Sequence, residues 1–256
     1  MRVPLFKMEA IGIIPAHFGS SRFEGKVLAD ILGKPMIQWV YEAASKVKLL
    51  DDLIIACDDE RILRAAKNFG AKAVLTSKDH SCGTDRIAEV VNPIDTRIVI
   101  NIQADEPLIH PSMIDMVGRT LLDNTNVVMS TLRKEITKAA ELFDSNIVKV
   151  VVDKDDFALY FSRSAIPSPE RYIDKASSSL PKGFFKHIGL YAYTKDFLFT
   201  LKKLPASNME KIERLEQLRV LENGYKIKVI ETNFETIGVD RPEDLTKVVA
   251  MLTHEK

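Results

Sequence analysis

Two basic side chains stand in a loop of small residues near the start of the chain. The apolar run Ile11–Pro15 ends there, and the loop that follows carries Arg22 and Lys26 among glycines and serines. Small residues let backbone N–H groups approach a ligand closely, and two cations can neutralise several negative charges. The pattern indicates a polyphosphate-binding loop. It is not a Walker loop, because Val27 follows the lysine; a polar surface loop is the competing interpretation.

A second group of residues suited to chemistry consists of carboxylates. The apolar segment Ile98–Ile102 is followed by Asp105 and Glu106, and then by Pro107. Mg²⁺ prefers oxygen ligands and is usually held by one or two carboxylates together with substrate phosphates. We therefore predict Asp105 as a Mg²⁺ ligand, against the simpler interpretation of a turn before the proline. Asp240 stands just before a predicted helix, so taken alone it is better interpreted as a capping residue, and a functional role for it depends on that of Asp105.

Alternating strands and helices must position these loops. Repeated strand–helix–strand units build a mostly parallel sheet with helices on both faces. Ligands then bind beyond the carboxyl ends of the strands. Both loops fall there: the loop with Arg22 and Lys26, called the basic loop, and the loop with Asp105 and Glu106, called the carboxylate loop. The predicted strands are Ile11–Pro15, Asp52–Ala56, Ala73–Leu75 and Ile98–Ile102, and the predicted helices are Met36–Val47, Glu60–Phe69 and Arg86–Val91.

The second half of the chain does not continue the regular alternation of strands and helices. We expect one domain over residues 1–256, with a smaller antiparallel lobe at about residues 127–193. The lobe contains a loop rich in proline and serine, and no internal repeat is evident. The predicted elements are strands at Val127–Leu132, Ile147–Val152 and Ala158–Phe161, the loop Ser164–Gly183, a helix at Met209–Asn223, a strand at Lys226–Glu231 and a closing helix that begins near Pro242.

Composition excludes several classes of protein. The 256 residues are 46% apolar, which is enough for a sizeable core, and 36 basic residues balance 36 acidic ones. No global field therefore draws the chain to nucleic acid or to a membrane surface. No apolar stretch is long enough for a signal peptide or a membrane span, so we expect a cytoplasmic protein. Cys57 and Cys82 lack metal-site spacing, and we expect two free thiols.

Eight ordered segments closely resemble the cytidylyltransferases that activate 3-deoxy-D-manno-octulosonate (Kdo), the CMP-Kdo synthetases of lipopolysaccharide assembly. The likeness runs from about Ile11 to Val249. The first segment is shared with other sugar nucleotidyltransferases, whereas the fifth, sixth and seventh are far more specific. The segments are Gly19-Ser-Ser-Arg-Phe-x-Gly-Lys26, Gly33-Lys-Pro-Met-Ile37, Gly83-Thr-Asp-Arg86, Gln103-x-Asp-Glu-Pro107, Tyr160-Phe-Ser-Arg-x-x-Ile-Pro167, His187-Ile-Gly-x-Tyr191, Glu213-x-Leu-Glu-Gln-Leu-Arg219 and Gly238-Val-Asp-x-Pro-Glu-Asp244.

The resemblance implies a Rossmann-like fold of the nucleotide-diphospho-sugar transferase type and a Mg²⁺-dependent reaction. The anomeric hydroxyl of the sugar acid attacks the α-phosphorus of CTP, and pyrophosphate leaves. Arg22, Lys26, Asp105 and Asp240 are the implied catalytic residues, and the two aspartates are the implied Mg²⁺ ligands. The implied CTP-binding residues are Ala16, His17, Gly19, Ser20, Ser21, Arg22, Lys26, Cys82, Gly83, Thr84, Arg86, Gln103, Ala104 and Asp105.

The resemblance also implies a site for the sugar acid and a homodimer that associates through the antiparallel lobe. Arg163 is expected to pair with the substrate carboxylate. Glu213 and Gln217 stand four apart in the predicted helix and should share a face. Taken singly, these residues also suit structural roles. The implied residues are Gln103, Arg163, His187, Tyr191, Glu213, Glu216 and Gln217.

Four residues depart from the family pattern. His17 replaces an arginine and so exchanges a permanent charge for a conditional one. Glu24 replaces a proline and Cys82 replaces a serine. Ala104 replaces a glycine, which strains the backbone only if φ at this position is positive. Two alternatives therefore stay open: a catalytically weakened CTP-binding homologue, and the same reaction on the 8-amino analogue of Kdo. A dinucleotide-dependent oxidoreductase is disfavoured, because no Gly-x-Gly-x-x-Gly is present.

Overall fold

The computed structural model describes residues 7–20, 22–80, 82–170 and 180–254. Its strands are β1 (Met8–Ala16), β2 (Asp30–Ile31), β3 (Lys34–Pro35), β4 (Asp52–Cys57), β5 (Ala73–Leu75), β6 (Thr96–Asn101), β7 (Met129–Glu135), β8 (Lys149–Val152), β9 (Ala158–Ser162), β10 (Phe185–Thr194) and β11 (Lys228–Glu231). Its helices are α1 (Met36–Ala44), α2 (Glu60–Asn68), α3 (Gly83–Val91), α4 (Pro111–Asp123), α5 (Ala139–Phe143), α6 (Lys195–Lys203), α7 (Asn208–Glu213), α8 (Gln217–Glu222) and α9 (Pro242–His254), with a 3-10 turn η1 (Lys26–Leu28).

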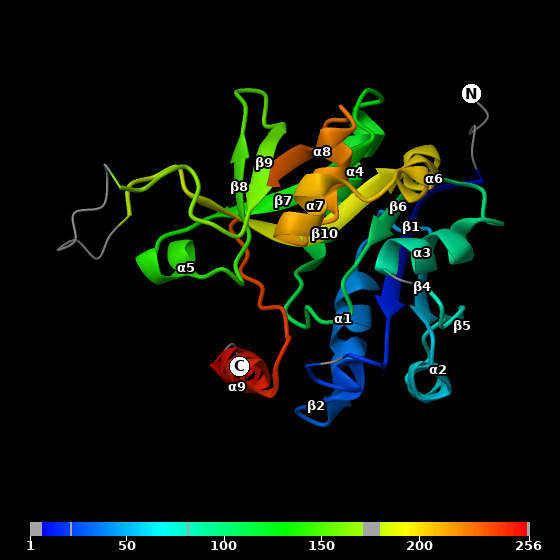
Figure 1. Cartoon of the computed structure of the whole chain (residues 1–256). Coiled ribbons are helices and arrows are strands. Elements are labelled where there is room, and N and C mark those ends of the chain that lie inside the picture. Colours follow the sequence, from blue (N-terminus) through cyan, green and yellow to red (C-terminus); the bar gives the residue numbers. More distant parts are fainter. Residues whose placement is uncertain (1–6, 21, 81, 171–179, 255–256) are drawn as a thin grey trace.

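A central sheet runs in the order β11-β7-β10-β6-β1-β4-β5, with helices on both faces (Figure 1). β1 pairs in parallel with β4 and β6, and β4 pairs in parallel with β5. β10 is antiparallel to both of its neighbours in this path, β6 and β7. The predicted α/β fold with a mostly parallel sheet is therefore confirmed, and β10 makes the sheet mixed.

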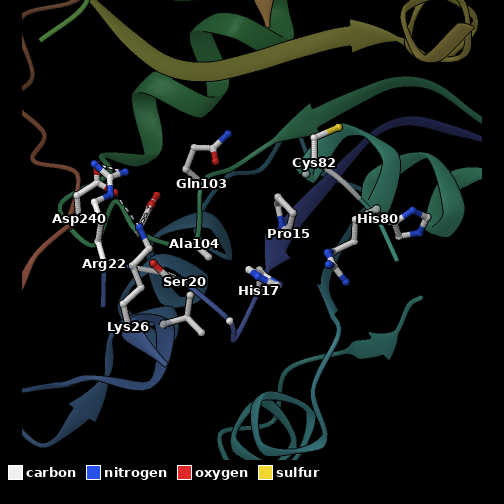
Figure 2. A pocket seen from close by; sticks show the side chains of 15 residues that line it. Pro15, His17, Ser20, Arg22, Lys26, His80, Cys82, Gln103, Ala104 and Asp240 are labelled. Carbon is white, nitrogen blue, oxygen red and sulfur yellow. Dashed lines mark hydrogen bonds and ion pairs between the residues drawn. The ribbon is translucent and has the colours of Figure 1, made fainter. Parts of the chain in front are cut away.

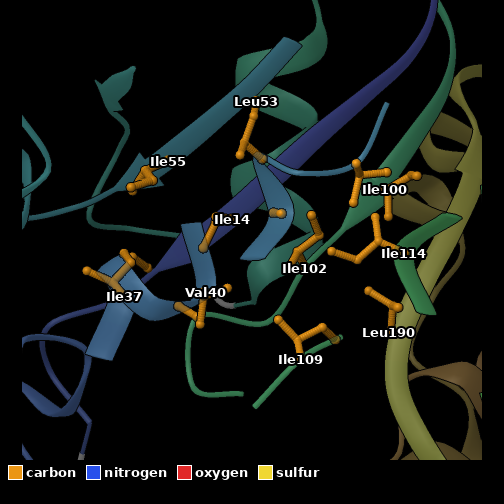
Figure 3. Close-up of a cluster of buried hydrophobic side chains, with 14 of the residues drawn as sticks. Ile14, Ile37, Val40, Leu53, Ile55, Ile100, Ile102, Ile109, Ile114 and Leu190 are labelled. Carbon is orange, nitrogen blue, oxygen red and sulfur yellow. The ribbon is translucent and has the colours of Figure 1, made fainter. Parts of the chain in front are cut away.

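Both faces of the sheet are buried, as β1 illustrates. Ala10 and Ile14 belong to a cluster that includes residues of α1, α2 and α4, shown in Figure 3. Ile11 and Ile13 belong to a second cluster with residues of α3, α6 and α8. Because successive side chains of a strand point to opposite faces, one continuous apolar run supplies both cores.

The antiparallel part of the chain is distributed differently from the prediction. β7 and β10 are strands of the central path, whereas β8 and β9 pair with each other beside it, and β8 also pairs with the start of β10. A smaller antiparallel unit is present, but it consists of the β8–β9 hairpin and its junction with β10. Whether this region mediates dimerisation stays a prediction.

The predicted helix over residues 209–223 is wrong, because it is broken. α7 ends at Glu213, Arg214 has a left-handed backbone with φ 55°, and α8 begins at Gln217. The break turns the two predicted ligands, Glu213 and Gln217, in different directions, so they do not share a helix face.

A separate small cluster fixes the C-terminal segment. Val239 and Val248 pack with Ile31 and Met36, which joins α9 to α1 and to the β2–β3 hairpin. The backbone N–H of Val239 also donates to the carbonyl oxygen of Asp105 at 2.8 Å, which holds the segment between β11 and α9 against the loop that follows β6. Among the residues described, no helix is long and apolar enough to cross a membrane.

Candidate active site

The basic loop, the carboxylate loop and the segment before α9 line one cavity of about 470 Å³ (Figure 2). They meet because β1 and β6 are adjacent parallel strands whose carboxyl ends lie at the same edge of the sheet. Three lining residues were not predicted: Pro15, Val27 and His80. The predicted residues that line this cavity are His17, Gly19, Ser20, Arg22, Lys26, Cys82, Gly83, Arg86, Gln103, Ala104, Asp105 and Asp240.

Lys26 holds the two predicted metal ligands together. Its Nζ lies 2.6 Å from Asp105 Oδ2 and 3.1 Å from Asp240 Oδ1, and it donates to the carbonyl oxygen of Val239 at 3.0 Å. Burial alone would lower the pKa of Lys26, but the two carboxylates outweigh it and raise the pKa above its ordinary value. The lysine therefore remains charged, and the two carboxylates converge on one cation.

Asp240 faces the cavity rather than capping α9. Its Oδ2 lies 3.1 Å from Nη2 of Arg22, in addition to its contact with Lys26. The backbone N–H groups of Asp240 and Arg241, just before α9, donate instead to the carboxylate of Asp244. The competing interpretation of Asp240 as a helix cap is therefore wrong.

The end of the basic loop requires a glycine. Gly25 has φ 67°, and a Cβ there would lie 2.9 Å from the ring of Phe18. That ring is itself covered by the Arg61 guanidinium, whose carbon lies 3.4 Å from the ring centroid. Glycine at this position is thus dictated both by the backbone conformation and by the packing beneath it.

Two of the predicted CTP-binding residues that the structure describes do not line this cavity. Ala16 is fully buried at the end of β1. Thr84 donates to Glu216 at 2.7 Å, and both residues line a different cavity. Ser21 lies outside the described residues.

A larger cavity of about 850 Å³ adjoins the first, and Gln103 lines both. Of the residues predicted for the sugar acid, Gln103, His187, Tyr191 and Gln217 line it. Glu106 lines it as well, and its carboxylate accepts a hydrogen bond from Thr236 at 3.0 Å.

Burial shifts the pKa values of three groups that line this larger cavity toward the uncharged form, whereas Lys186, Glu141 and Glu235 line it as ion-paired charges. Burial lowers the pKa of His187 to about 3, which leaves a neutral imidazole. Burial and the neighbouring Asp105 raise the pKa of Glu106 to about 7. Burial also raises the pKa of Tyr191, so its hydroxyl keeps its proton. These side chains are suited to hydrogen-bonding the hydroxyl groups of a sugar.

The other three predicted sugar ligands serve contacts within the protein. Arg163 donates from Nε to the carbonyl oxygen of Glu213 at 2.8 Å and from Nη1 to that of Ser145 at 3.1 Å. The Glu213 carboxylate accepts from the hydroxyl of Ser162 at 2.6 Å and from the N–H of Arg163 at 2.9 Å. With Glu216 bonded to Thr84, none of these three lines the larger cavity. In the structure they therefore act as structural residues.

The donors present fit a Mg²⁺ ion that is bound partly by the protein and partly by a substrate. Asp105 and Asp240 offer hard oxygen donors that already converge on a cation. Over the described part of the chain, no cluster of three or more His, Cys, Asp or Glu side chains could hold a metal. Two carboxylates alone leave most of an octahedral Mg²⁺ shell to water and to phosphate oxygens.

Comparisons with known proteins point to one family. A family model described as cytidylyltransferase matches residues 11–228. The chain is 48% identical to the 3-deoxy-manno-octulosonate cytidylyltransferase of Geotalea uraniireducens, over 96% of this chain and 99% of that protein. It is 50% identical to the enzyme of the same name from Solibacter usitatus, over 93% and 92%. A solved structure of CMP:2-keto-3-deoxy-manno-octonic acid synthetase complexed with CTP superposes with a TM-score of 0.88 at 42% identity, covering 97% of this chain and all of that one.

Proposed function

Since this chain belongs to the 3-deoxy-manno-octulosonate cytidylyltransferase family, we propose that it transfers CMP from CTP to the anomeric hydroxyl of Kdo and releases pyrophosphate. The predicted family and its nucleotide-diphospho-sugar transferase fold are confirmed by this membership. In the reaction the hydroxyl oxygen forms a bond to the α-phosphorus. The bond between the α-phosphorus and the oxygen that bridges it to the β-phosphorus breaks, pyrophosphate leaves with that oxygen, and the hydroxyl proton is released. The product CMP-Kdo serves lipopolysaccharide synthesis.

The cavity shared by the basic and carboxylate loops is the proposed CTP site. Arg22 and Lys26 would neutralise the triphosphate, while Ser20 and the backbone of the loop donate hydrogen bonds to it. Asp105 and Asp240 would hold Mg²⁺ together with the phosphates. When bound, the ion supplies charge neutralisation at the phosphate and favours ionisation of the attacking hydroxyl. Catalysis then depends mainly on positioning and charge stabilisation.

The larger cavity is the proposed sugar-acid site. Its neutral groups, His187, Tyr191 and Gln217, suit the hydroxyls of the sugar. Gln103 stands in the wall common to both cavities, which is where the reacting hydroxyl and the α-phosphate must meet. This shared wall beside Asp105 is the observation that carries the proposal, because transfer between two bound substrates needs adjoining sites. We further propose a cytoplasmic homodimer.

Pyrophosphate release by the purified protein tests the proposal. The reaction mixture contains CTP and Mg²⁺ with Kdo, with its 8-amino analogue, or with no sugar acid, and each arm is repeated without Mg²⁺. We expect release only when both Mg²⁺ and Kdo are present. Faster release with the 8-amino compound would assign that substrate instead. No release with either sugar acid would refute the proposed reaction.

A further inference from the structure

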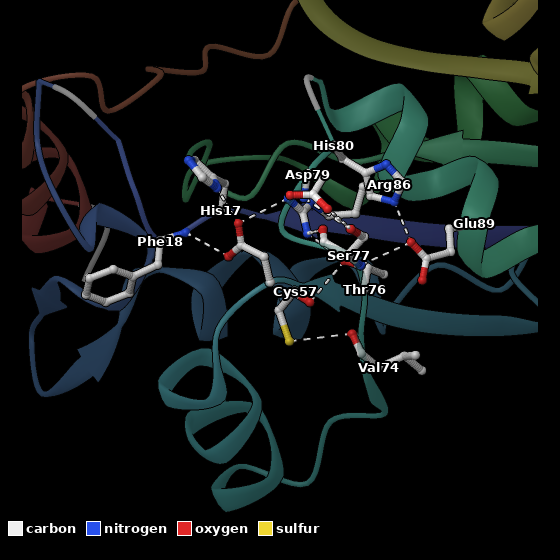
Figure 4. Close-up of polar contacts among 11 residues, drawn as sticks. His17, Phe18, Cys57, Val74, Thr76, Ser77, Asp79, His80, Arg86 and Glu89 are labelled. Atoms are coloured by element: carbon white, nitrogen blue, oxygen red, sulfur yellow. Dashed lines mark hydrogen bonds and ion pairs between the residues drawn. The ribbon is translucent and has the colours of Figure 1, made fainter.

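A buried aspartate that no sequence motif indicated lies directly behind the nucleotide cavity. Asp58 follows β4 and is 5% exposed. Its Oδ1 accepts the backbone N–H of Phe18 at 3.1 Å, and its Oδ2 accepts from Nη2 of Arg86 at 3.1 Å and from Nδ1 of His17 (Figure 4). One carboxylate thus holds the first residues of the basic loop and a side chain of α3 together.

The contact with Asp58 determines how His17 presents its ring. A carboxylate can only accept hydrogen bonds, so Nδ1 of His17 must carry a proton. The other ring nitrogen, Nε2, then faces away from Asp58. It lies on the side of Gly19, where a Cβ would be 3.1 Å from it, and the half-exposed ring lines the cavity. Nε2 is therefore available to a ligand in the cavity.

Arg86 is bound too firmly to swing into the cavity. Its side chain is 4% exposed, and besides Asp58 it donates to the Thr76 hydroxyl at 2.5 Å and to the Ser77 carbonyl oxygen at 3.3 Å. The charge of Arg86 is balanced by Asp58, and its fixed position supports the wall next to His17. Asp58 consequently fixes two residues that line the cavity, His17 and Arg86, and also the backbone at the start of the basic loop through Phe18.

We propose that Asp58 is a positioning residue of the nucleotide site: it orients His17 so that Nε2 contacts the triphosphate and anchors the basic loop through Phe18. The inference rests on the proposed function, because it takes CTP as the ligand. It explains how a histidine can serve at the position where the resemblance to the family leads us to expect an arginine. The planar guanidinium of an arginine presents several N–H donors to a phosphate in a fixed arrangement. An imidazole presents a single nitrogen, and a second residue must fix the orientation of its ring.

Substitution of Asp58 by asparagine tests the proposal, since the side chain keeps its size and one oxygen. The new amide group carries no charge, and its single oxygen cannot accept at both positions of the carboxylate, from Phe18 on one side and from His17 and Arg86 on the other. We expect the dissociation constant for CTP, measured by calorimetry, to rise about tenfold, as for loss of one charge-assisted hydrogen bond. The KM for the sugar acid should change less than twofold. Unchanged CTP affinity would overturn the proposal.

Asp59 provides a matched control. It caps α2 and pairs with Arg61 but does not line the cavity. Asp59→Asn should therefore lower thermal stability and leave CTP affinity unchanged. If Asp59→Asn weakened CTP binding as much as Asp58→Asn, the loss would come from disturbing the segment after β4 and not from the contacts of Asp58. The positioning role would then be rejected.

Two further measurements separate this role from a structural one. In the protein without nucleotide, ¹⁵N NMR of His17 should show a protonated Nδ1, and this state should be lost in Asp58→Asn. The readout holds even if the protein transfers no CMP, so the failure of one proposal is distinguishable from that of the other. Should Asp58→Asn not fold, His17→Ala retains the Phe18 and Arg86 contacts of Asp58 and must itself weaken CTP binding about tenfold. Wild-type affinity in that variant would contradict the proposal.

Discussion

The neutral state of His187 leads to a quantitative prediction about acid stability. The ring lies in β10 against Phe161, with ring centroids 4.9 Å apart, and its Nε2 is 2.9 Å from the hydroxyl of Thr131. Burial lowers the pKa of His187 from 6.5 to about 3. Protonation in the folded protein would place a charge beside the Phe161 ring and the Thr131 hydroxyl, and neither of these neighbours is a counter-ion.

The sign of the effect follows from proton binding. Between the two pKa values, about 6.5 unfolded and about 3 folded, the unfolded chain binds a proton at this position and the folded chain does not. Stability is therefore lost as the pH falls through 6.5 and recovered as it rises. The loss approaches about 1.4 kcal/mol per pH unit and amounts to about 2 kcal/mol at about pH 5.

The variant His187→Gln removes the titrating group and keeps a polar side chain beside Thr131. On acidification from about pH 7.5 to about pH 5, wild type should lose about 2 kcal/mol more than the variant, as measured by urea unfolding at each pH. For a chain of this size the difference corresponds to about 4 to 8 °C in Tm. Other acid-sensitive groups contribute equally to both proteins. An equal loss in wild type and variant would refute the assignment of a neutral His187.

Three other perturbations test the remaining parts of the site. Asp105→Asn or Asp240→Asn should lower kcat by about 10²-fold or more with little change in Tm, and wild-type turnover would refute their role as Mg²⁺ ligands. Lys26→Met leaves Asp105 without its cation and Asp240 with Arg22 alone. Tm without Mg²⁺ should therefore fall by several degrees, and added Mg²⁺ should stabilise the variant more than wild type; equal shifts would contradict this. Arg163→Ala removes two hydrogen bonds to carbonyl oxygens and should cost about 1 to 3 kcal/mol of stability, whereas a higher KM for the sugar acid at unchanged Tm would show that Arg163 binds the substrate carboxylate instead.

The parts of the fold that the sequence predicts are those set by local patterns. The apolar run at Ile11–Pro15 and the run at Ile98–Ile102 became β1 and β6, and their neighbouring carboxyl ends brought the basic and carboxylate loops together. The β5 strand was predicted with its observed bounds, Ala73–Leu75. Parallel topology follows from the alternation of strands and helices, and it places loops far apart in sequence at one edge.

The missed features depend on contacts between distant segments. An apolar pattern does not reveal that β10 enters the sheet antiparallel between β6 and β7. Nor does it show that the chain turns at Arg214, because helical spacing continues through that residue in the sequence while the backbone there is left-handed. Asp58 escaped notice for the same reason: its partners His17 and Arg86 come from other elements of the fold.

The departures from the family pattern are accommodated by their surroundings. The described non-glycine residues with positive φ do not include Ala104, so its methyl group causes no backbone strain. Burial raises the pKa of the Cys82 thiol to about 11, which keeps it neutral beside a triphosphate, and Glu24 is exposed and does not line the cavity. His17 is oriented by Asp58. Each change thus has a local reason to be tolerated, and together they favour an active transferase over a homologue that only binds CTP.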